Sequence, residues 1–261
     1  MDKLFLLRYD TENKDVEQMS GFLEKAIEIH QKHEIPATFF CTGGAIDARE
    51  KDFRAFYQEV KNDPLFDIQD HSYTHIGLGY EAGKPVEVLK ADYEKSFAAH
   101  ERVFGKSPIG LSICGTSGAD GKRLSGFDQT EKSRTEFAMI ADLGVKMINS
   151  CLTNIQESRA FTNYSSLGYS DIMGFPSAYS DTSWMHRNEH DDPVEFILAQ
   201  IDDRVNTNDH MPLMLHDWVA WNHAPDKNLT HVVQIVDHAR SKDYKLVTHE
   251  WCLQEESLWK S

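Results

Sequence analysis

Residues 4–41 read LFLLRYDTENKDVEQMSGFLEKAIEIHQKHEIPATFFC, and this stretch decides the fold. Its first run, 4–9, is short and apolar, which is typical of a buried strand. Apolar residues then recur at helical spacing over 16–32, and a second compact apolar run covers 37–41 after Pro36. A strand, a helix and another strand in this order predict a βαβ unit, the building block of a parallel sheet.

The rest of the chain continues the same alternation. Further strands are expected at 65–69, 110–114, 145–150, 171–175, 212–216 and 245–248, and helices at 53–60, 86–104, 130–143, 193–205 and 229–240. Seven or eight βα units in 261 residues favour an α/β fold, a distorted (β/α) barrel of parallel strands in a single domain over 1–261. No Gly-x-Gly-x-x-Gly follows the first strand, so a dinucleotide-binding fold has little support.

Composition excludes several classes of partner. The chain carries 42 acidic against 27 basic residues, a formal net charge of −15. A surface this acidic repels phosphate groups, so we expect neither nucleic acid nor an anionic membrane as a partner. The sequence holds no apolar run of membrane-spanning length and opens without a signal-peptide pattern, which predicts a cytoplasmic protein. Four widely spaced cysteines at 41, 114, 151 and 252 are expected to be free thiols.

Polar side chains gather where the predicted strands end. Asp10 and Glu12 follow the first strand, His71 and His75 follow the third, and His216 follows the run 212–215. The carboxyl ends of parallel strands lie on one face of such a fold, where active sites form. We therefore expect two carboxylates and three histidines to converge there.

The His-x-x-x-His pair is the strongest candidate for a metal site. If residues 71–75 form one helical turn, the imidazoles of His71 and His75 lie on the same side and can bind one divalent cation. A carboxylate of Asp10 or Glu12 would complete the site, and the other would accept a proton from water. Two histidines and a carboxylate suit zinc best, with cobalt, iron and manganese as alternatives. The alternative interpretation is a pair of surface histidines in a loop.

His216 is a candidate proton donor to a leaving nitrogen, with a nearby carboxylate setting its tautomer and pKa. Asp217 directly follows it, and Asp181 lies in the stretch after the sixth strand. The alternative is a core histidine bonded to backbone. Three tryptophans accompany this region and could wall the pocket or stack on a sugar, or simply pack in the core: Trp184, Trp218 and Trp221.

Four motifs together resemble the polysaccharide deacetylase superfamily, also called the NodB-homology or carbohydrate esterase family 4 superfamily. HSYTH at 71–75 resembles its metal motif, and PATFFCTG at 36–43 resembles its second-strand signature. LRYDTE at 7–12 is similar to its first motif, in the branch that writes it Asp-x-Asp, and MLHD at 214–217 resembles its last motif. The resemblance extends from residue 4 to about residue 247. It implies a distorted barrel, usually of seven strands.

The resemblance also implies roles. Asp10 would be the general base, Glu12, His71 and His75 would bind the metal, and His216 would protonate the leaving nitrogen. The backbone after Cys114, at Gly115, would help to stabilise the oxyanion.

The chain departs from the family at two places. Its third motif, SICGTSGADGKR at 112–123, lacks the usual arginine, although Arg123 is near, and it is more similar to deformylases that act on lipid-carrier-linked amino sugars. Glu12 stands where the family has aspartate.

These observations predict a metal-dependent hydrolase that removes an N-acetyl or N-formyl group from a carbohydrate. Two alternatives stay open. One is an amidase for a small cyclic amide or ureide, and the other is a carbohydrate-binding barrel that has lost catalysis. The sequence gives no indication of oligomeric state.

Overall fold

The computed structural model of the chain describes residues 2–78, 84–114, 130–150, 160–176, 178–181, 192–207, 209–223 and 226–260. Its strands are β1 (Leu4–Thr11), β2 (Ala37–Cys41), β3 (Phe66–Asp70), β4 (Gly110–Ile113), β5 (Met147–Ser150), β6 (Thr162–Tyr164), β7 (Tyr169–Gly174), β8 (Tyr179–Ser180), β9 (Met211–His216) and β10 (Lys245–Leu246). Its helices are α1 (Phe22–Lys32), α2 (Gly43–Ala48), α3 (Glu50–Val60), α4 (Val86–Phe104), α5 (Glu131–Asp142), α6 (Pro193–Thr207), α7 (Asp217–Asn222), α8 (Thr230–Ser241) and α9 (His249–Gln254).

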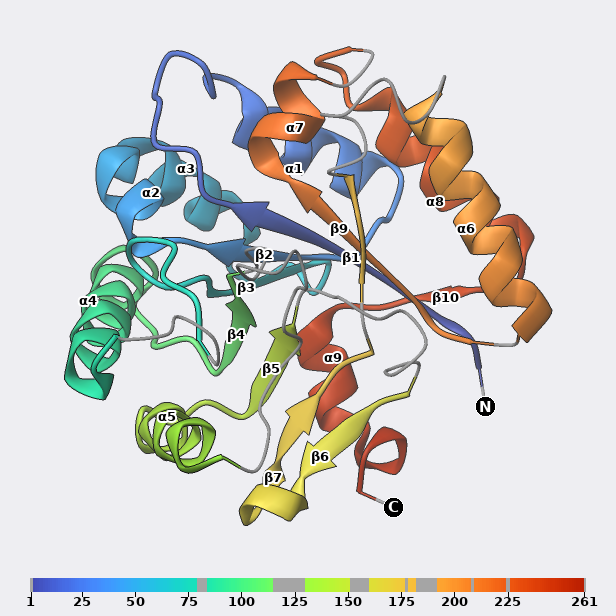
Figure 1. Cartoon of the computed structure of the whole chain (residues 1–261). Coiled ribbons are helices and arrows are strands. Elements are labelled where there is room, and N and C mark those ends of the chain that lie inside the picture. Colours follow the sequence, from blue (N-terminus) through green and yellow to red (C-terminus); the bar gives the residue numbers. More distant parts are fainter. Residues whose placement is uncertain are drawn as a thin grey trace.

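The strands form one curved, mostly parallel sheet (Figure 1). Its order is β6-β7-β5-β4-β3-β2-β1-β9-β8, and β10 pairs with the start of β1. Only the β6–β7 pair is antiparallel among the described pairings. The expected α/β class with a barrel-like parallel sheet is therefore confirmed, although the described strands do not close into a complete ring.

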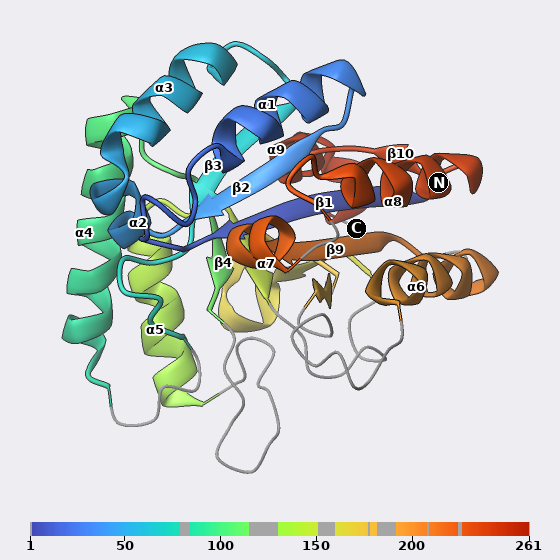
Figure 2. The ribbon, with the colours of Figure 1, turned by 90° about the horizontal axis from the view of Figure 1, so that it is seen from above.

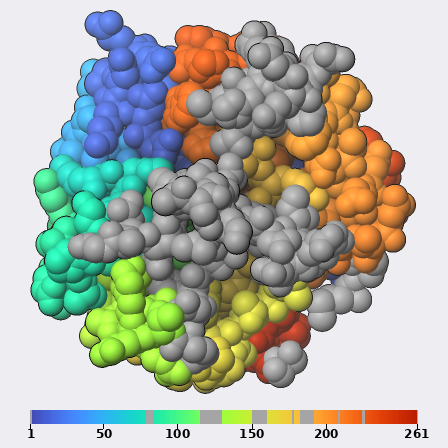
Figure 3. All heavy atoms as spheres, in the orientation of Figure 1, coloured from blue at the N-terminus to red at the C-terminus, as the bar shows by residue number. Residues whose placement is uncertain are grey.

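Helices cover the outer side of this sheet. Figure 2 shows α1 and α3 over one part of it, α4 and α5 over the next, and α6 and α8 beside β9. Two apolar clusters fill these layers, one under α1, α3, α6 and α8 and the other under α4 and α5. The face seen in Figure 3 has the first half of the chain on its left side and the second half mainly on its right.

Helix α9 lies inside the curve of the sheet instead (Figure 1). Its first residue, His249, bonds to Thr38 of β2 and to Asn149 of β5, and its ring packs on Phe40 and Phe175. A third apolar cluster around Leu4 and Leu6 fills the rest of this interior. The C-terminal segment therefore fills the interior of the curved sheet.

Side-chain alternation along β1 connects this interior to the strand end. Phe5, Leu7 and Tyr9 enter the outer core, whereas Leu4 and Leu6 enter the inner cluster. Because successive side chains of a strand point to opposite faces, Arg8 and Asp10 continue the inner series. The Arg8–Asp10 ion pair agrees with this placement. Asp10 therefore lies on the inner face of the sheet, near the carboxyl end of β1.

Several elements differ from those expected from the sequence, and three of these differences have a clear physical reason. The helix expected over 16–32 begins only at Phe22, because Gly21 has φ +86° and interrupts the helical path. The strand expected over 245–248 ends at Leu246, since Thr248 caps α9 by accepting a hydrogen bond from the Trp251 amide. The antiparallel β6 was not expected, because its three residues are too short to produce a pattern.

The thiols provide a first testable prediction. Cys41, Cys114 and Cys252 are buried and free, and Cys151 lies outside the described residues. Burial raises the pKa of all three described thiols, which keeps them protonated and unreactive. Iodoacetamide should therefore label them only after unfolding, without any reductant, as read by peptide mass spectrometry. A disulfide that joins two of them would contradict this prediction.

Candidate active site

Four predicted residues meet at the ends of β1 and β3. His75 Nε2 lies 3.0 Å from Glu12 Oε2, and His71 Nε2 lies 3.7 Å from the same oxygen. His71 Nε2 is also 3.6 Å from Asp10 Oδ2. His71 and Asp10 are buried, while Glu12 and His75 reach the mouth of the site. The ends of β1 and β3, which lie on either side of β2, have therefore brought the expected donors within range of one ion.

The two histidines converge through a loop, which corrects the expected helical turn. Residues 71–78 contain no helix, and Ser72 and His75 have positive φ angles of 59° and 64°. Backbone–side-chain bonds hold this shape: Asp70 accepts from the Ser72 amide, and Asp92 accepts from the amides of Tyr73 and Thr74. The imidazoles of His71 and His75 stand edge to face, 5.0 Å apart. The spacing was informative, but the local conformation inferred from it was wrong.

Hydrogen bonds select which nitrogen of His71 faces the site. His71 Nδ1 lies 2.8 Å from the Ser112 carbonyl oxygen, so this nitrogen donates and Nε2 is left as the free ligand atom. Burial lowers the pKa of His75, but its hydrogen bond and charge contact with Glu12 raise it overall. Burial raises the pKa of Glu12, but the same hydrogen bond and the charges of His71 and His216 lower it to about 2. The carboxylate is therefore ionised.

A divalent cation fits this donor set. Asp10 Oδ1 is buried and has no hydrogen-bond partner among the described residues, while buried Glu12 Oε2 faces His75 Nε2 at 3.0 Å and His71 Nε2 at 3.7 Å. Buried carboxylate oxygens without partners are costly, and a bound cation would compensate them. Cys114 Sγ also lies near both histidines, and the ligand atoms of His71, His75 and Cys114 are within 4.8 Å of one another. Its sulfur is close enough to ligate the same ion, which the sequence did not indicate, although burial favours the protonated thiol when no metal is bound.

His216 lies on the neighbouring strand, opposite Asp10 in the β1–β9 register. Its Nδ1 is 2.7 Å from Asp181 Oδ1, and its backbone amide donates to Asp181 Oδ2 at 2.8 Å. Burial lowers the pKa of His216, but the charge and hydrogen bond of fully buried Asp181 raise it to about 10. The arrangement holds an imidazolium at the strand end.

Asp217 has a different role from the one its sequence position suggested. Among the described residues it forms no hydrogen bond with the His216 ring; its carboxylate accepts from the amides of Glu12 and Asn13 and from Arg49. These bonds fix the segment that follows β1. Asp217 follows His216 in the sequence, but its side chain bonds to the segment after β1 and not to the imidazole.

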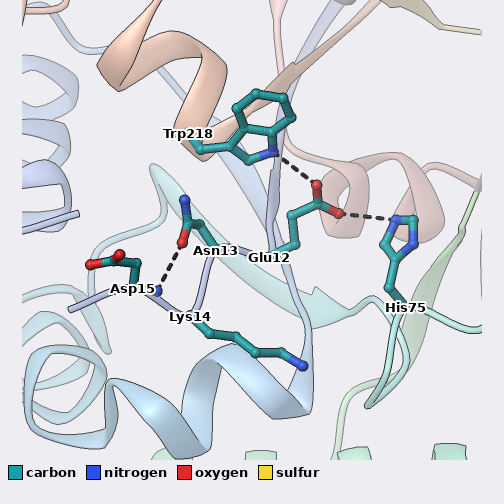
Figure 4. Close-up of a pocket in the computed structure, with 6 residues that line it drawn as sticks. All are labelled: Glu12, Asn13, Lys14, Asp15, His75 and Trp218. Carbon is teal, nitrogen blue, oxygen red and sulfur yellow. Dashed lines mark hydrogen bonds and ion pairs between the residues drawn. The ribbon is translucent and has the colours of Figure 1, made fainter. Parts of the chain in front are cut away.

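The three tryptophans have different surroundings. Trp218 Nε1 donates to Glu12 Oε1 at 2.9 Å, so this ring borders the site (Figure 4). Trp221 is buried and packs against Phe22, as the core-packing alternative required. Trp184, like Gly115, lies outside the described residues.

A hollow of about 410 Å³ opens beside these groups. Glu12, His75 and Trp218 line it together with Asn13, Lys14 and Asp15, and Figure 4 shows Glu12 between the indole and the imidazole. Its volume suits a small ligand or one part of a larger one. It offers a route from solvent to the metal donors.

Fold and site together define an α/β barrel-like protein with a candidate metal centre at the carboxyl ends of its strands. Residues 2–122 match the family model named polysaccharide deacetylase. This match confirms the resemblance seen in the motifs at 7–12, 36–43 and 71–75, whereas the motif at 214–217 lies beyond the matched residues. A sequence comparison with curated proteins finds no match.

Solved structures show the same fold over nearly the whole chain. A protein from Mycobacterium smegmatis assigned as a polysaccharide deacetylase aligns with a TM-score of 0.72 at 10% identity, covering 98% of this chain and 91% of that one. Bacillus subtilis PdaA, a family 4 carbohydrate esterase, aligns at 0.58 with 14% identity over 98% and 82%. BA3943 from Bacillus anthracis, described as a pseudoenzyme of that family, aligns at 0.57 with 12% identity over 97% and 66%. None of the described helices is long and apolar enough to cross a bilayer.

Proposed function

We propose that this protein is a metal-dependent hydrolase that removes an N-acetyl or N-formyl group from an amino sugar or glycan. The family match and the structural relatives support carbohydrate deacetylation in general. The observation that carries the proposal is the meeting of three groups at one mouth: the Glu12–His71–His75 donors, the carboxylate of Asp10, and the His216–Asp181 pair.

Each residue has a defined task in this chemistry. Glu12, His71 and His75 would hold the cation, which supplies polarisation of the acyl carbonyl and acidification of water. Asp10 accepts the proton of the attacking water, while the water oxygen bonds to the carbonyl carbon. His216 then donates its Nε2 proton to the leaving nitrogen as the C–N bond breaks, giving a free amine and acetate or formate. Asp181 retains the proton on Nδ1 and keeps the ring oriented.

A panel of N-acetylated and N-formylated amino sugars, chitin oligomers and cyclic ureides tests the proposal. Purified protein supplied with zinc, cobalt or manganese should release acetate or formate from at least one amino-sugar substrate, measured by an enzymatic acid assay. Turnover of cyclic ureides alone would favour the non-sugar amidase. Binding of glycans without any acid release would favour a barrel that has lost catalysis.

The His216–Asp181 pair also predicts a pH effect. Asp181→Asn removes the negative charge that raises the pKa of His216, so that pKa should fall. At alkaline pH the variant's imidazole is then neutral where the wild-type ring is still protonated. The alkaline limb of kcat/KM against pH should move to lower pH.

Asp202→Asn is a matched control for this experiment. Asp202 accepts a hydrogen bond from His238 at 2.9 Å in a partly buried pair between α6 and α8. Its removal should leave the pH profile unchanged. An identical alkaline limb in Asp181→Asn and wild type would show that Asp181 does not control the acid.

A further inference from the structure

Arg8 is a charged residue in an unusual place. It lies in the middle of the central strand β1, with neighbours Thr38 on β2 and Met214 on β9 in the register. Its side chain is 1% exposed, and the guanidinium stands 5.4 Å from the centre of the Phe40 ring. Because burying a cation is unfavourable, a strand interior normally carries an apolar side chain at such a position.

The surroundings of Arg8 supply little compensation. Among the described residues, Asp10 is the carboxylate that forms an ion pair with it, with Nη2 3.3 Å from Oδ2. The same Nη2 also contacts the sulfur of Met214, whereas Nε and Nη1 have no hydrogen-bond partner in the described part of the chain. Arg8 also lowers the pKa of His249 on the opposite side, after burial itself. The guanidinium thus lies between the C-terminal helix and Asp10.

Geometry shows what this contact does to the Asp10 carboxylate. Arg8 Nη2 contacts Oδ2 from the side of the barrel interior, and the same oxygen lies 3.6 Å from His71 Nε2. Oδ1 is buried with no described partner. The two oxygens are therefore unequal, since one is anchored and the other is free to accept a proton. Asp10 and Arg8 share the inner face because they are two residues apart on one strand.

We propose that Arg8 is a positioning residue that fixes the Asp10 carboxylate through Oδ2 and presents Oδ1 to the attacking water. This inference rests on the proposed function of Asp10 as the base. The ion pair comes from within β1, so the rigid central strand sets both the base and its anchor. A misplacement of a catalytic group by about 1 Å can reduce turnover about a hundredfold.

Two replacements separate the anchor from the packing. Arg8→Met fills a similar volume and keeps contact with Phe40 but removes the donors, and Arg8→Lys restores one charged donor. We expect kcat to fall about tenfold to a hundredfold in Arg8→Met, less in Arg8→Lys, with KM and metal content little changed. A crystal structure of Arg8→Met should show the Asp10 carboxylate turned from its wild-type orientation.

A double-mutant cycle with Asp10→Asn decides whether Arg8 acts through Asp10. If it does, Arg8→Met combined with Asp10→Asn should be no slower than Asp10→Asn alone. A general structural effect would multiply the two losses. Arg204→Met is the matched control, because Arg204 is also fully buried and stands over an aromatic ring, Tyr179, at 5.1 Å. It should keep wild-type kcat.

The outcomes are distinguishable. Multiplied losses, an unchanged kcat in Arg8→Met, or an equal loss in Arg204→Met would overturn the role of Arg8 while acyl release by the wild type still supports the proposed function. Absence of acyl release by the wild type would overturn both. If Arg8→Met does not fold, the same cycle is run with Arg8→Lys, where a loss that disappears in the Asp10→Asn background supports the proposal and a multiplied loss rejects it.

Discussion

Removal of His216 or of the Asp10 carboxylate should lower kcat about a hundredfold or more, as the loss of a placed proton-transfer group usually does. The structure places the two residues opposite each other on β1 and β9. His216→Ala removes the proposed proton donor to the nitrogen, and Asp10→Asn removes the proposed acceptor for the water proton. Initial-rate kinetics with the best substrate of the acyl panel would measure both.

Metal content is the control for these variants. His216 ligates nothing in the proposed site, so His216→Ala should keep its metal, as measured by elemental analysis. Asp10→Asn should also keep it if Glu12 is the carboxylate ligand. Normal turnover in both variants would remove the acid–base mechanism and favour the binding-protein alternative.

Loss of a metal ligand should have an effect of similar or larger size. One three-ligand site requires about one cation per chain in protein purified without chelators. His71→Ala should lose that cation, because Nε2 of this buried ring is a central donor whose other nitrogen is fixed on the Ser112 carbonyl. Activity should fall to background and should not return with moderate added metal. Unchanged metal content in His71→Ala would show that the site is elsewhere.

The two carboxylates can be distinguished by the same measurement. Glu12 Oε2 lies near both imidazoles, 3.0 Å from His75 Nε2 and 3.7 Å from His71 Nε2. Asp10 Oδ2 makes such a contact with His71 but not with His75, at 3.6 Å. Glu12→Gln should therefore lose metal and Asp10→Asn should keep it. The reverse pattern would exchange their roles, making Asp10 the ligand and Glu12 the base.

The sequence was sufficient for the parts of this protein that depend on simple periodicity. Buried parallel strands are short apolar runs, and their carboxyl ends share one face, so Asp10, His71 and His216 could be placed together without a structure. The family match over residues 2–122 agrees with the motifs quoted from that region.

Other features depended on contacts between distant residues. The loop that carries His71 and His75 takes its shape from Ser96 and Asp92 on α4, which hold Asp70 and the following amides. Asp181 reaches His216 because the two-residue strand β8 lies beside β9, a pairing too short to leave a sequence signal. The alternation of side chains along β1 could have placed Arg8 on the same face as Asp10. The sequence offered no reason to use this rule, because a single arginine in an apolar strand has no pattern around it.

The position of β1 also has a consequence for how the chain folds. Strand β1 pairs with β2, but also with β9 and β10, and the space beneath it is filled by α9. Strands β9 and β10 therefore emerge from the ribosome more than two hundred residues after the parts of β1 that they pair with. Such distant contacts slow folding, because a long loop must close before they form. Strand β1, which carries Asp10, therefore lacks two of its pairing strands and the α9 packing beneath it until residues 211–254 have been synthesised, so the candidate site can assemble only after that point.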